Sequence, residues 1–311
     1  MKAIVVKRYG GPEVLEPALV PTPEPRAGEV RIAVRAAGTN PVDAGNRSDG
    51  RWSGLVLPWI PGYEVSGVID RLGADVSGLS IGDRVMAMTR FRRQTGGYAQ
   101  YLVVQADAVA RLADSTSFIA AAATPLAGGT ALEMLSRLNL ARGDRLLVLG
   151  ASGGVGSYLL QLAALRGVTV CAVGRAEHHD RMRRLGASVA IDYRLPNATR
   201  HLDGRPVDAI ADLVGGDALT TWLPALRSGG HIAAVATPTL DFDPLLDANI
   251  TFHGVLVTPD GNRTRHLARM LGDGQILADV SHTLPLEEAA QAHRILETGH
   301  TGGKVVLTIE A

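Results

Sequence analysis

The sequence predicts an α/β protein of two parts, in which a doubly wound parallel sheet is inserted into a β-rich domain. Three observations predict this fold class. Short strand-like segments with glycine turns come first, strands then alternate with helices, and one more strand closes the chain. Because that last strand needs a pairing partner, we expect the β-rich domain to receive it. We place the β-rich domain at 1–118, completed by 260–311, and the inserted domain at 119–259.

The N-terminal region is typical of a compact β domain. Lys2 to Val6 begins a strand, and further on Val30, Ile32 and Val34 alternate with arginines, which is the two-residue period of a half-buried strand. Glycine-rich turn signals recur at Gly10-Gly11, Gly82-Asp83 and Gly96-Gly97.

From about Ser115 the pattern favours helix, with a break at Pro125 and a second helical segment from Thr130 to Leu138. Strands are then expected at about 145–150, 169–174, 188–193, 207–214, 230–236 and 250–257. Helices between such strands are crossover connections, so the sheet should be parallel. The end of the chain predicts a helix from Pro285 to Thr298 and a strand from Gly302 to Ile309.

Composition excludes several classes of protein. The 311 residues carry a formal net charge of zero, which gives no electrostatic argument for a nucleic acid or an anionic membrane as partner. The single cysteine, Cys171, excludes an internal disulfide and a multi-cysteine zinc site. No apolar run approaches the roughly 20 residues of a membrane span, and Met1 leads directly into a strand instead of a signal peptide. We therefore expect a cytoplasmic protein.

The most informative stretch runs from Arg145 to Ser157. An apolar run predicts a buried strand, four glycines follow within seven residues, and an amphipathic helix then begins. This is the order of a Rossmann dinucleotide site, where a helix N-terminus offers N–H groups and roughly half a positive charge to a pyrophosphate. In the GxGxxG pattern Ala151 replaces the first glycine, whereas Gly153 and Gly156 hold the second and third places. Tight packing alone could also explain these glycines, but the surrounding strand and helix alternation favours the nucleotide interpretation.

Several ordered motifs resemble those of the medium-chain dehydrogenase/reductases, in particular the zinc-free NADPH:quinone oxidoreductase branch that includes zeta-crystallin. They are distributed over essentially the whole chain: Gly38–Asp43, Pro61–Gly67, Gly82–Val85, Gly97–Tyr101, Leu126–Thr130, Gly150–Gly156, Leu185–Ala187 and Gly303–Leu307. The resemblance implies a Rossmann NADPH-binding domain inserted in a GroES-like catalytic domain.

The resemblance also bears on metal binding. Zinc-dependent relatives place a cysteine where this chain has Asn40, a histidine where it has Tyr63, and a further ligand where it has Leu126. A catalytic zinc needs three Cys, His or carboxylate ligands and one open position. We therefore expect a reaction without a metal.

A quinone or conjugated enone suits such a site, because the charge left by an added hydride is delocalised into the acceptor's own carbonyl. The protein then supplies mainly orientation and a donor near that oxygen. The resemblance points to Asn40 and Tyr63 as catalytic residues. Two plainer interpretations stay open: Asn40 before Pro41 fits a helix N-cap, and Tyr63 could be a core aromatic with its hydroxyl satisfied.

Cofactor choice depends on the end of the second strand, where an NAD site usually presents an acidic residue. Gly174 and Arg175 stand there instead, which leaves room for a 2′-phosphate and a guanidinium to pair with it. Glu177 could serve NAD if the turn is shifted. In all, we expect contacts to NADPH from Asn40, Thr130, Ala151, Ser152, Gly153, Gly154, Val155, Gly174, Arg175, His178, Tyr193, Val214, Val235, Ala236, Leu256 and Lys304.

These expectations describe an NADPH-dependent reductase of quinones or other conjugated carbonyl compounds. An enone or enoyl-thioester reductase and an NADPH-binding structural or regulatory protein are the alternatives. The arginine-rich segment Arg90–Thr95 is either a solvated loop or a contact for an anionic thioester. By resemblance we expect a homodimer joined through 250–257, a small-molecule substrate held between the domains, and neither nucleic acid nor membrane as partner.

Overall fold

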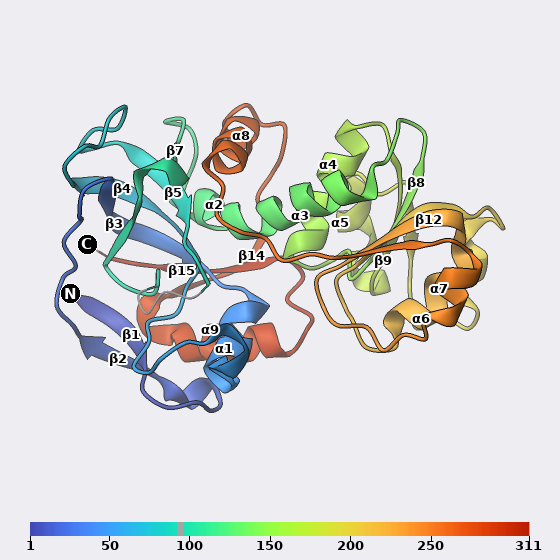
Figure 1. The fold of residues 1–311 in the computed structure, drawn as a ribbon, viewed down its shortest axis with the longest axis horizontal. Coiled ribbons are helices and arrows are strands. Elements are labelled where there is room, and N and C mark those ends of the chain that lie inside the picture. Colours follow the sequence, from blue (N-terminus) through green and yellow to red (C-terminus); the bar gives the residue numbers. More distant parts are fainter. Residues whose placement is uncertain (92–95, 311) are drawn as a thin grey trace. The chain divides into compact units, whose positions relative to one another are not determined.

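The computed structural model describes residues 1–91 and 96–310, so part of the arginine-rich segment, 92–95, lies outside the described residues. Contacts within the chain divide it into two compact units, residues 1–129 with 258–311 and residues 130–257 (Figure 1). The second unit is thus inserted into the first along the sequence. The domain boundaries predicted at 118/119 and 259/260 stay a prediction, which limited proteolysis would test.

The second unit is built on a parallel sheet with the strand order β10-β9-β8-β11-β12-β13. Its strands are β8 (Arg145–Leu149), β9 (Thr169–Val173), β10 (Val189–Ile191), β11 (Val207–Asp212), β12 (Leu226–Ala234) and β13 (Thr251–Gly254). Its helices are α4 (Gly154–Leu165), α5 (His179–Arg184), α6 (Ala218–Trp222) and α7 (Asp243–Asp247), and α3 (Pro125–Leu138) enters from the first unit.

The chain order in this sheet reverses beside β8. The strands that follow β8 extend first toward β10 and then, from β11 on, toward β13. Right-handed crossovers place the connecting helices of the two halves on opposite faces, and ligands bind at such a switch point. The expected doubly wound parallel sheet is confirmed.

The core of this unit follows from its buried strands. Leu146, Leu147 and Val148 of β8 are inaccessible to solvent, as the apolar run predicted. One face of the sheet packs Leu147, Cys171 and Ile210 into a single apolar cluster. Cys171 is therefore a core residue.

The first unit contains a largely antiparallel sheet with the order β14-β15-β3-β4-β5-β7, and β6 pairs with β3. Its strands are β3 (Glu29–Gly38), β4 (Glu64–Leu72), β5 (Arg84–Met88), β6 (Tyr101–Gln105), β7 (Val109–Arg111), β14 (Val280–Pro285) and β15 (Lys304–Thr308), beside the separate pair β1 (Lys2–Val6) and β2 (Leu15–Leu19). Its helices are α1 (Pro41–Ser48), α2 (Phe118–Ala122), α8 (Gly261–Gly272) and α9 (Ala289–Glu297).

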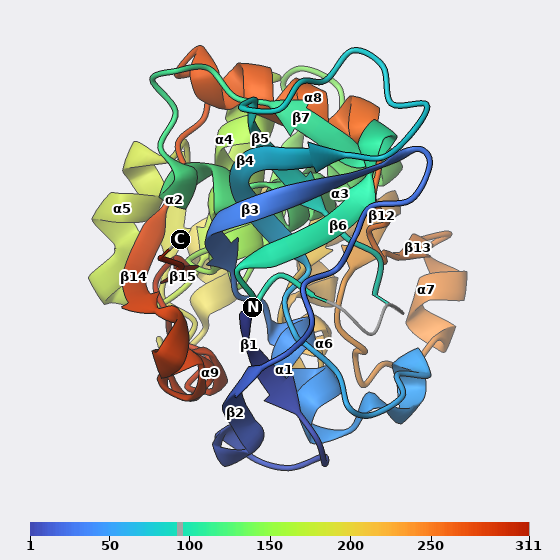
Figure 2. The ribbon, with the colours of Figure 1, turned by 90° about the vertical axis from the view of Figure 1, so that its left-hand side faces the viewer.

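The long strand β3 organises this sheet. β4 pairs along one edge, and the other edge is shared between β6 and the terminal strand β15 (Figure 2). Residue Val306 of β15 lies opposite Gly38, so the last strand returns to the first domain as expected.

Two expectations about local structure were wrong. β3 is buried on both faces rather than half-buried, and Arg31 is only 7% exposed because its guanidinium pairs with Asp70 and Glu24. The helix expected from residue 130 begins at Pro125, since proline suits the first helical position, where no N–H bond is needed. Among the residues described, no helix has the length and apolar character to cross a membrane.

Candidate functional site

The glycine-rich turn after β8 has the backbone of a phosphate site. Gly150 adopts a left-handed φ of 77°, so it makes the tight turn and Ala151 can replace the first glycine of the pattern. A β-carbon at Gly156 would lie 2.4 Å from Ala151 O, which explains the third glycine by close packing. At Gly153 it would meet only Gly150 O, at 3.5 Å. Gly153 therefore leaves space beside the start of α4, whose first N–H groups have no acceptor within the helix.

The predicted contacts Val214, Val235, Ala236 and Leu256 all follow the carboxyl ends of β11, β12 and β13. These ends share one edge of the parallel sheet with the glycine-rich turn. Val214 and Leu256 are exposed apolar side chains, 55% and 63% accessible. An edge with free helix N–H groups and uncovered apolar side chains fits a dinucleotide. The predicted contact Thr130 lies apart from this edge in the sequence, buried within α3.

The end of β9 brings together the residues expected to choose the cofactor. A β-carbon on the buried Gly174 would lie 3.5 Å from Ser152 Oγ, so the glycine-rich turn and the β9 end are adjacent. Arg175 Nε donates to Tyr193 Oη over 3.3 Å. Glu177 Oε1 lies 3.8 Å from Arg175 Nη1 and 3.8 Å from His178 Nε2. The acidic residue that could serve NAD thus shares its surroundings with the basic residues that could serve NADPH.

Two residues here were missed by sequence reasoning. Arg181 Nη2 donates to Ser152 O over 2.6 Å and ties α5 to the glycine-rich turn. Asp192 accepts from Ala176 N and forms an ion pair with Arg194, and the Arg194 hydrogen bond holds the pKa of this carboxyl far below its ordinary value. The sequence signal for Arg181 was only that of an arginine in a predicted helix. Because the chain has many arginines, that signal does not single out this residue.

A second polar cluster lies in the first unit, at the end of β3. Lys304 Nζ donates to Asn40 Oδ1 and Glu64 Oε1, both over 2.6 Å, and to Thr39 O over 2.8 Å. Asn40 Nδ2 donates to Glu64 Oε1 over 2.9 Å. All three side chains are buried, Glu64 completely. We call Asn40, Glu64 and Lys304 the Asn40 cluster.

Strand pairing assembles the Asn40 cluster from distant parts of the sequence. Gly38, the last residue of β3, lies opposite Glu64 on one side and opposite Val306 on the other. A β-carbon at Gly38 would lie 2.4 Å from Glu64 Oε1 and 2.4 Å from Ala122 O, so only glycine leaves room for the carboxylate. Leu126 N donates to Glu64 Oε2 over 2.7 Å. Four of the separate motifs quoted above thus meet at one point.

Asn40 is the N-cap residue of α1, as the plainer interpretation expected, and it forms a capping box with Asp43 at the third helical position. The cap comes from Asp43, whose Oδ2 accepts from Asn40 N and whose Oδ1 accepts from Gly62 N, both at 2.9 Å. The Asn40 amide nitrogen is not needed for this cap and donates to Glu64 in the cluster.

Asp43 also acts electrostatically on a buried chain of polar side chains. The Tyr98 hydroxyl lies 3.2 Å from His293 Nε2, and Arg47 Nη1 lies 3.4 Å from His293 Nδ1. Burial, and then the charge of Asp43, raises the pKa of Tyr98 well above its ordinary value. Because arginine can only donate, His293 accepts at Nδ1 and donates from Nε2 to Tyr98. Burial raises the pKa of Asp43 to about 7 and lowers the pKa of His293 to about 3.

Tyr63 lies in an aromatic group with Trp59 and Phe91 and is 1% exposed. Its hydroxyl accepts from Asn46 Nδ2 and donates to Phe91 O. Burial, then the charge of Asp43, raises the pKa of this phenol far above its ordinary value. This is the arrangement of a core aromatic with a satisfied hydroxyl, and a catalytic part for Tyr63 stays a prediction.

Within residues 1–91 and 96–310, no group of three His, Cys, Asp or Glu side chains is placed to hold a metal ion. Asn40, Tyr63 and Leu126 offer an amide, a phenol and an alkyl group, which is not the donor set of a catalytic zinc.

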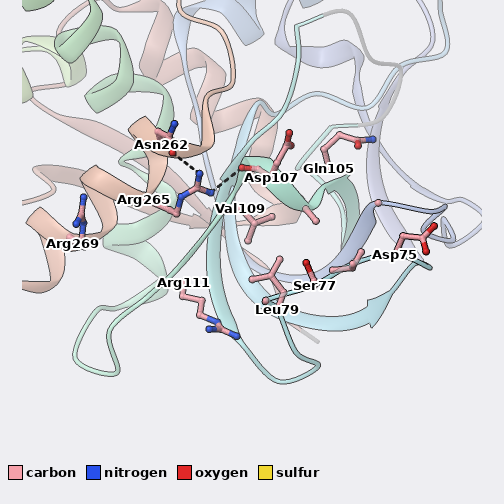
Figure 3. Close-up of a pocket in the computed structure, with 14 residues that line it drawn as sticks. Asp75, Ser77, Leu79, Gln105, Asp107, Val109, Arg111, Asn262, Arg265 and Arg269 are labelled. Atoms are coloured by element: carbon pink, nitrogen blue, oxygen red, sulfur yellow. Dashed lines mark hydrogen bonds between the residues drawn. The ribbon is translucent and has the colours of Figure 1, made fainter.

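A pocket elsewhere in the first unit is shown in Figure 3. It measures about 950 Å³ and is lined in part by Arg111, Arg265 and Arg269. Arg265 donates to Asp107 O and to Asn262 Oδ1. None of the predicted site residues lines this pocket, so it is not the candidate site.

Two parts of the chain match known families. Residues 26–114 match the alcohol dehydrogenase GroES-like domain, and residues 185–307 match a family described as zinc-binding dehydrogenase. A chloroplastic NADPH-dependent alkenal/one oxidoreductase of Arabidopsis thaliana is 33% identical over 99% of this chain and 79% of its own length. The chain belongs to the medium-chain dehydrogenase/reductases.

Solved structures of medium-chain dehydrogenase/reductases agree with this fold over the full length. The quinone oxidoreductase from Coxiella burnetii is 32% identical with a TM-score of 0.92, covering 100% of this chain and 99% of that one. An NAD-dependent alcohol dehydrogenase is 31% identical with a TM-score of 0.93, covering 100% of both chains. The predicted resemblance and the GroES-like and Rossmann assignments are thereby confirmed.

Proposed function

We propose that the protein is an NADPH-dependent oxidoreductase that transfers hydride to a quinone or another conjugated carbonyl acceptor without a metal. The observation that carries the proposal is the Asn40 cluster. At the position that matches a zinc ligand of metal-dependent relatives, a neutral amide is held by a buried ammonium and a buried carboxylate. The names of the alkenal/one and quinone oxidoreductase relatives support the same chemistry.

The residues of the chain divide the work between the two units. When bound, NADPH supplies the hydride. The glycine-rich turn and the start of α4 would hold its pyrophosphate, and the exposed apolar side chains at the sheet edge, such as Val214, would contact its rings. Asn40 would offer an N–H bond to a carbonyl oxygen of the nicotinamide or the acceptor. This hydrogen bond would orient the ring and stabilise negative charge that develops on the oxygen.

Arg175 and Tyr193 are proposed to hold the 2′-phosphate. Their side chains already touch, and among the described residues the exposed Glu177 is the one charge partner of Arg175. Arg175→Ala should weaken NADPH binding roughly tenfold to a hundredfold and change NADH binding less than about twofold. Arg183, an exposed α5 residue paired with Asp180, gives the matched control Arg183→Ala. Equal losses for both cofactors would contradict the assignment. They would favour NAD, the cofactor in the name of the similar NAD-dependent alcohol dehydrogenase.

The acceptor is tested by following NADPH oxidation with simple quinones, small enones and an enoyl-CoA. Turnover with quinones supports the proposal. Preference for enones favours the second candidate, alkenal or enone reduction, for which the Arabidopsis relative is named. Tight NADPH binding without turnover on any acceptor would overturn the enzymatic function.

We further propose a cytoplasmic homodimer joined through 250–257. β13 is the edge strand of its sheet, so one row of its backbone groups has no strand partner among the described residues. Sedimentation at a mass near twice 32.7 kDa is the expected result, and a monomer would contradict it.

A further inference from the structure

We infer that Glu64 and Lys304 act as a pair of positioning residues that fix the orientation of the Asn40 side-chain amide. The pair holds one N–H bond of Asn40 for a carbonyl oxygen of the cofactor or acceptor. The inference rests on the function proposed above, since that function assigns the contact to Asn40.

The chemistry of the two partners permits only one orientation of the amide. An ammonium can only donate and an ionised carboxylate can only accept. Lys304 Nζ at 2.6 Å must therefore face Asn40 Oδ1, and Glu64 Oε1 at 2.9 Å must face Asn40 Nδ2. A flipped amide would set N–H against N–H and oxygen against oxygen, at a buried place where water cannot compensate.

The partners are themselves held in place. Glu64 Oε2 accepts from Leu126 N at 2.7 Å, and Gly38 leaves the carboxylate room on its other side. The third N–H bond of Lys304 donates to Thr39 O, with Nζ and O 2.8 Å apart. All three N–H bonds of Lys304 are thus engaged, so its part is to position Asn40 rather than to contact a ligand.

One donor of the cluster is left over. Asn40 Nδ2 carries two protons, and within the described part of the chain only Glu64 accepts one of them. The second N–H is the group that a carbonyl oxygen can meet. Its direction is set by the ammonium and the carboxylate, and a misplacement of about 1 Å in such a donor can cost about a hundredfold in rate.

A double-mutant cycle tests the inference through NADPH oxidation. Glu64→Gln should lower kcat/KM about 10- to 100-fold in the native background, because a neutral amide cannot accept from Lys304, Asn40 and Leu126 together. In the Asn40→Ala background the same change should cost less than about twofold, since no amide remains to be oriented. Equal losses in both backgrounds would show a merely structural role and overturn the inference.

Glu29→Gln is the matched control. Glu29 is a buried carboxylate at the opposite end of β3 that accepts from Gln105 Nε2. The Glu29→Gln variant should have a changed unfolding midpoint but an unchanged kcat/KM. A loss of kcat/KM as large as that of Glu64→Gln would overturn the inference. It would show that removing the charge of any buried carboxylate of the sheet lowers activity, whether or not that carboxylate contacts Asn40.

A second variant keeps the test open if Glu64→Gln folds poorly. In Asn40→Asp/Glu64→Gln the charge is moved. The new amide can donate to position 40 and accept from Leu126 N, and Lys304 pairs with the new carboxylate but loses its acceptor at position 64, where it now meets an N–H group. The unfolding midpoint should lie above that of Glu64→Gln alone while activity stays lost, because the spare N–H bond of position 40 is gone. An active double variant would overturn the inference.

A readout independent of turnover separates the inference from the proposed function. Side-chain amide resonances of Asn40, assigned by Asn40→Ala, should exchange slowly in the native protein and at least tenfold faster in Glu64→Gln. Unchanged exchange overturns the positioning pair even if the enzyme works. Slow exchange that is lost in Glu64→Gln supports the pair even if no acceptor is turned over, and then only the proposed function fails.

Discussion

The two units use charge in opposite ways. In the first, Glu64, Lys304 and Asp43 are buried and almost every polar atom has a partner within the protein. In the second, Arg175 and Tyr193 are partly or largely exposed and make weak contacts. A buried charge costs free energy unless it is fully bonded, whereas an exposed one costs little. The first arrangement therefore fixes one geometry, and the second leaves charge free for a ligand.

This comparison predicts its largest effect for Lys304→Met. Removing the ammonium leaves Glu64 buried without its counter-charge, which should lower the free energy of unfolding by about 3–5 kcal/mol. Urea unfolding measures it. The matched change in the second unit, Arg175→Met, should cost less than about 1 kcal/mol because that side chain is partly exposed. Similar losses for the two variants would break the comparison.

The same difference explains what the sequence could predict. The glycine-rich turn is contiguous, and its chemistry lies in backbone conformation, so spacing and residue type predicted it. Gly150 is an example. The residue with the left-handed backbone is Gly150, one position before Ala151, so the glycine pattern could be recognised although Ala151 replaces its first glycine. The alternation of strands and helices predicted the parallel sheet for the same local reason.

The Asn40 cluster is different because strand pairing assembles it from residues up to 264 positions apart. Residue spacing gives no signal for such a site. Family resemblance supplied Asn40 and Lys304 but treated both as cofactor contacts, and Glu64 was not singled out at all. Burial decides its importance, and burial is a property of the folded sheet. The same holds for Arg31, which alternation placed on an exposed face although two carboxylates allow its burial.

The next effect in size concerns pH and two buried groups of the first unit. Burial raises the pKa of Asp43 from 3.8 to about 7, so its contribution to stability is present below pH 3.8 and is lost as the pH rises through 7. Burial lowers the pKa of His293 from 6.5 to about 3, so its contribution is present above pH 6.5 and is lost as the pH falls through 3. Between these limits the two trends oppose each other.

Single variants should uncover each trend. His293→Gln, which can still accept from Arg47 and donate to Tyr98, should lose stability as the pH rises from about 4 to 7. Asp43→Asn should gain stability as the pH rises from about 4 to 6.5. Thermal unfolding midpoints across this range, with the native protein between the two, are the measurement. Parallel profiles for all three proteins would show that Asp43 and His293 do not carry the opposing dependences.

The smallest effect is expected at Arg194. This residue tests the comparison with an exposed ion pair of the second unit. Arg194 forms a short ion pair with Asp192 at 2.7 Å, as short as many buried pairs, but its own side chain is half exposed. Asp192 also keeps its bonds from the backbone N–H groups of Ala176 and Arg194 when that side chain is removed. Arg194→Ala should therefore change the free energy of unfolding by less than about 1 kcal/mol, despite ideal geometry. A loss near that of Lys304→Met in urea unfolding would mean that contact distance, and not burial, governs the ion pairs of this protein.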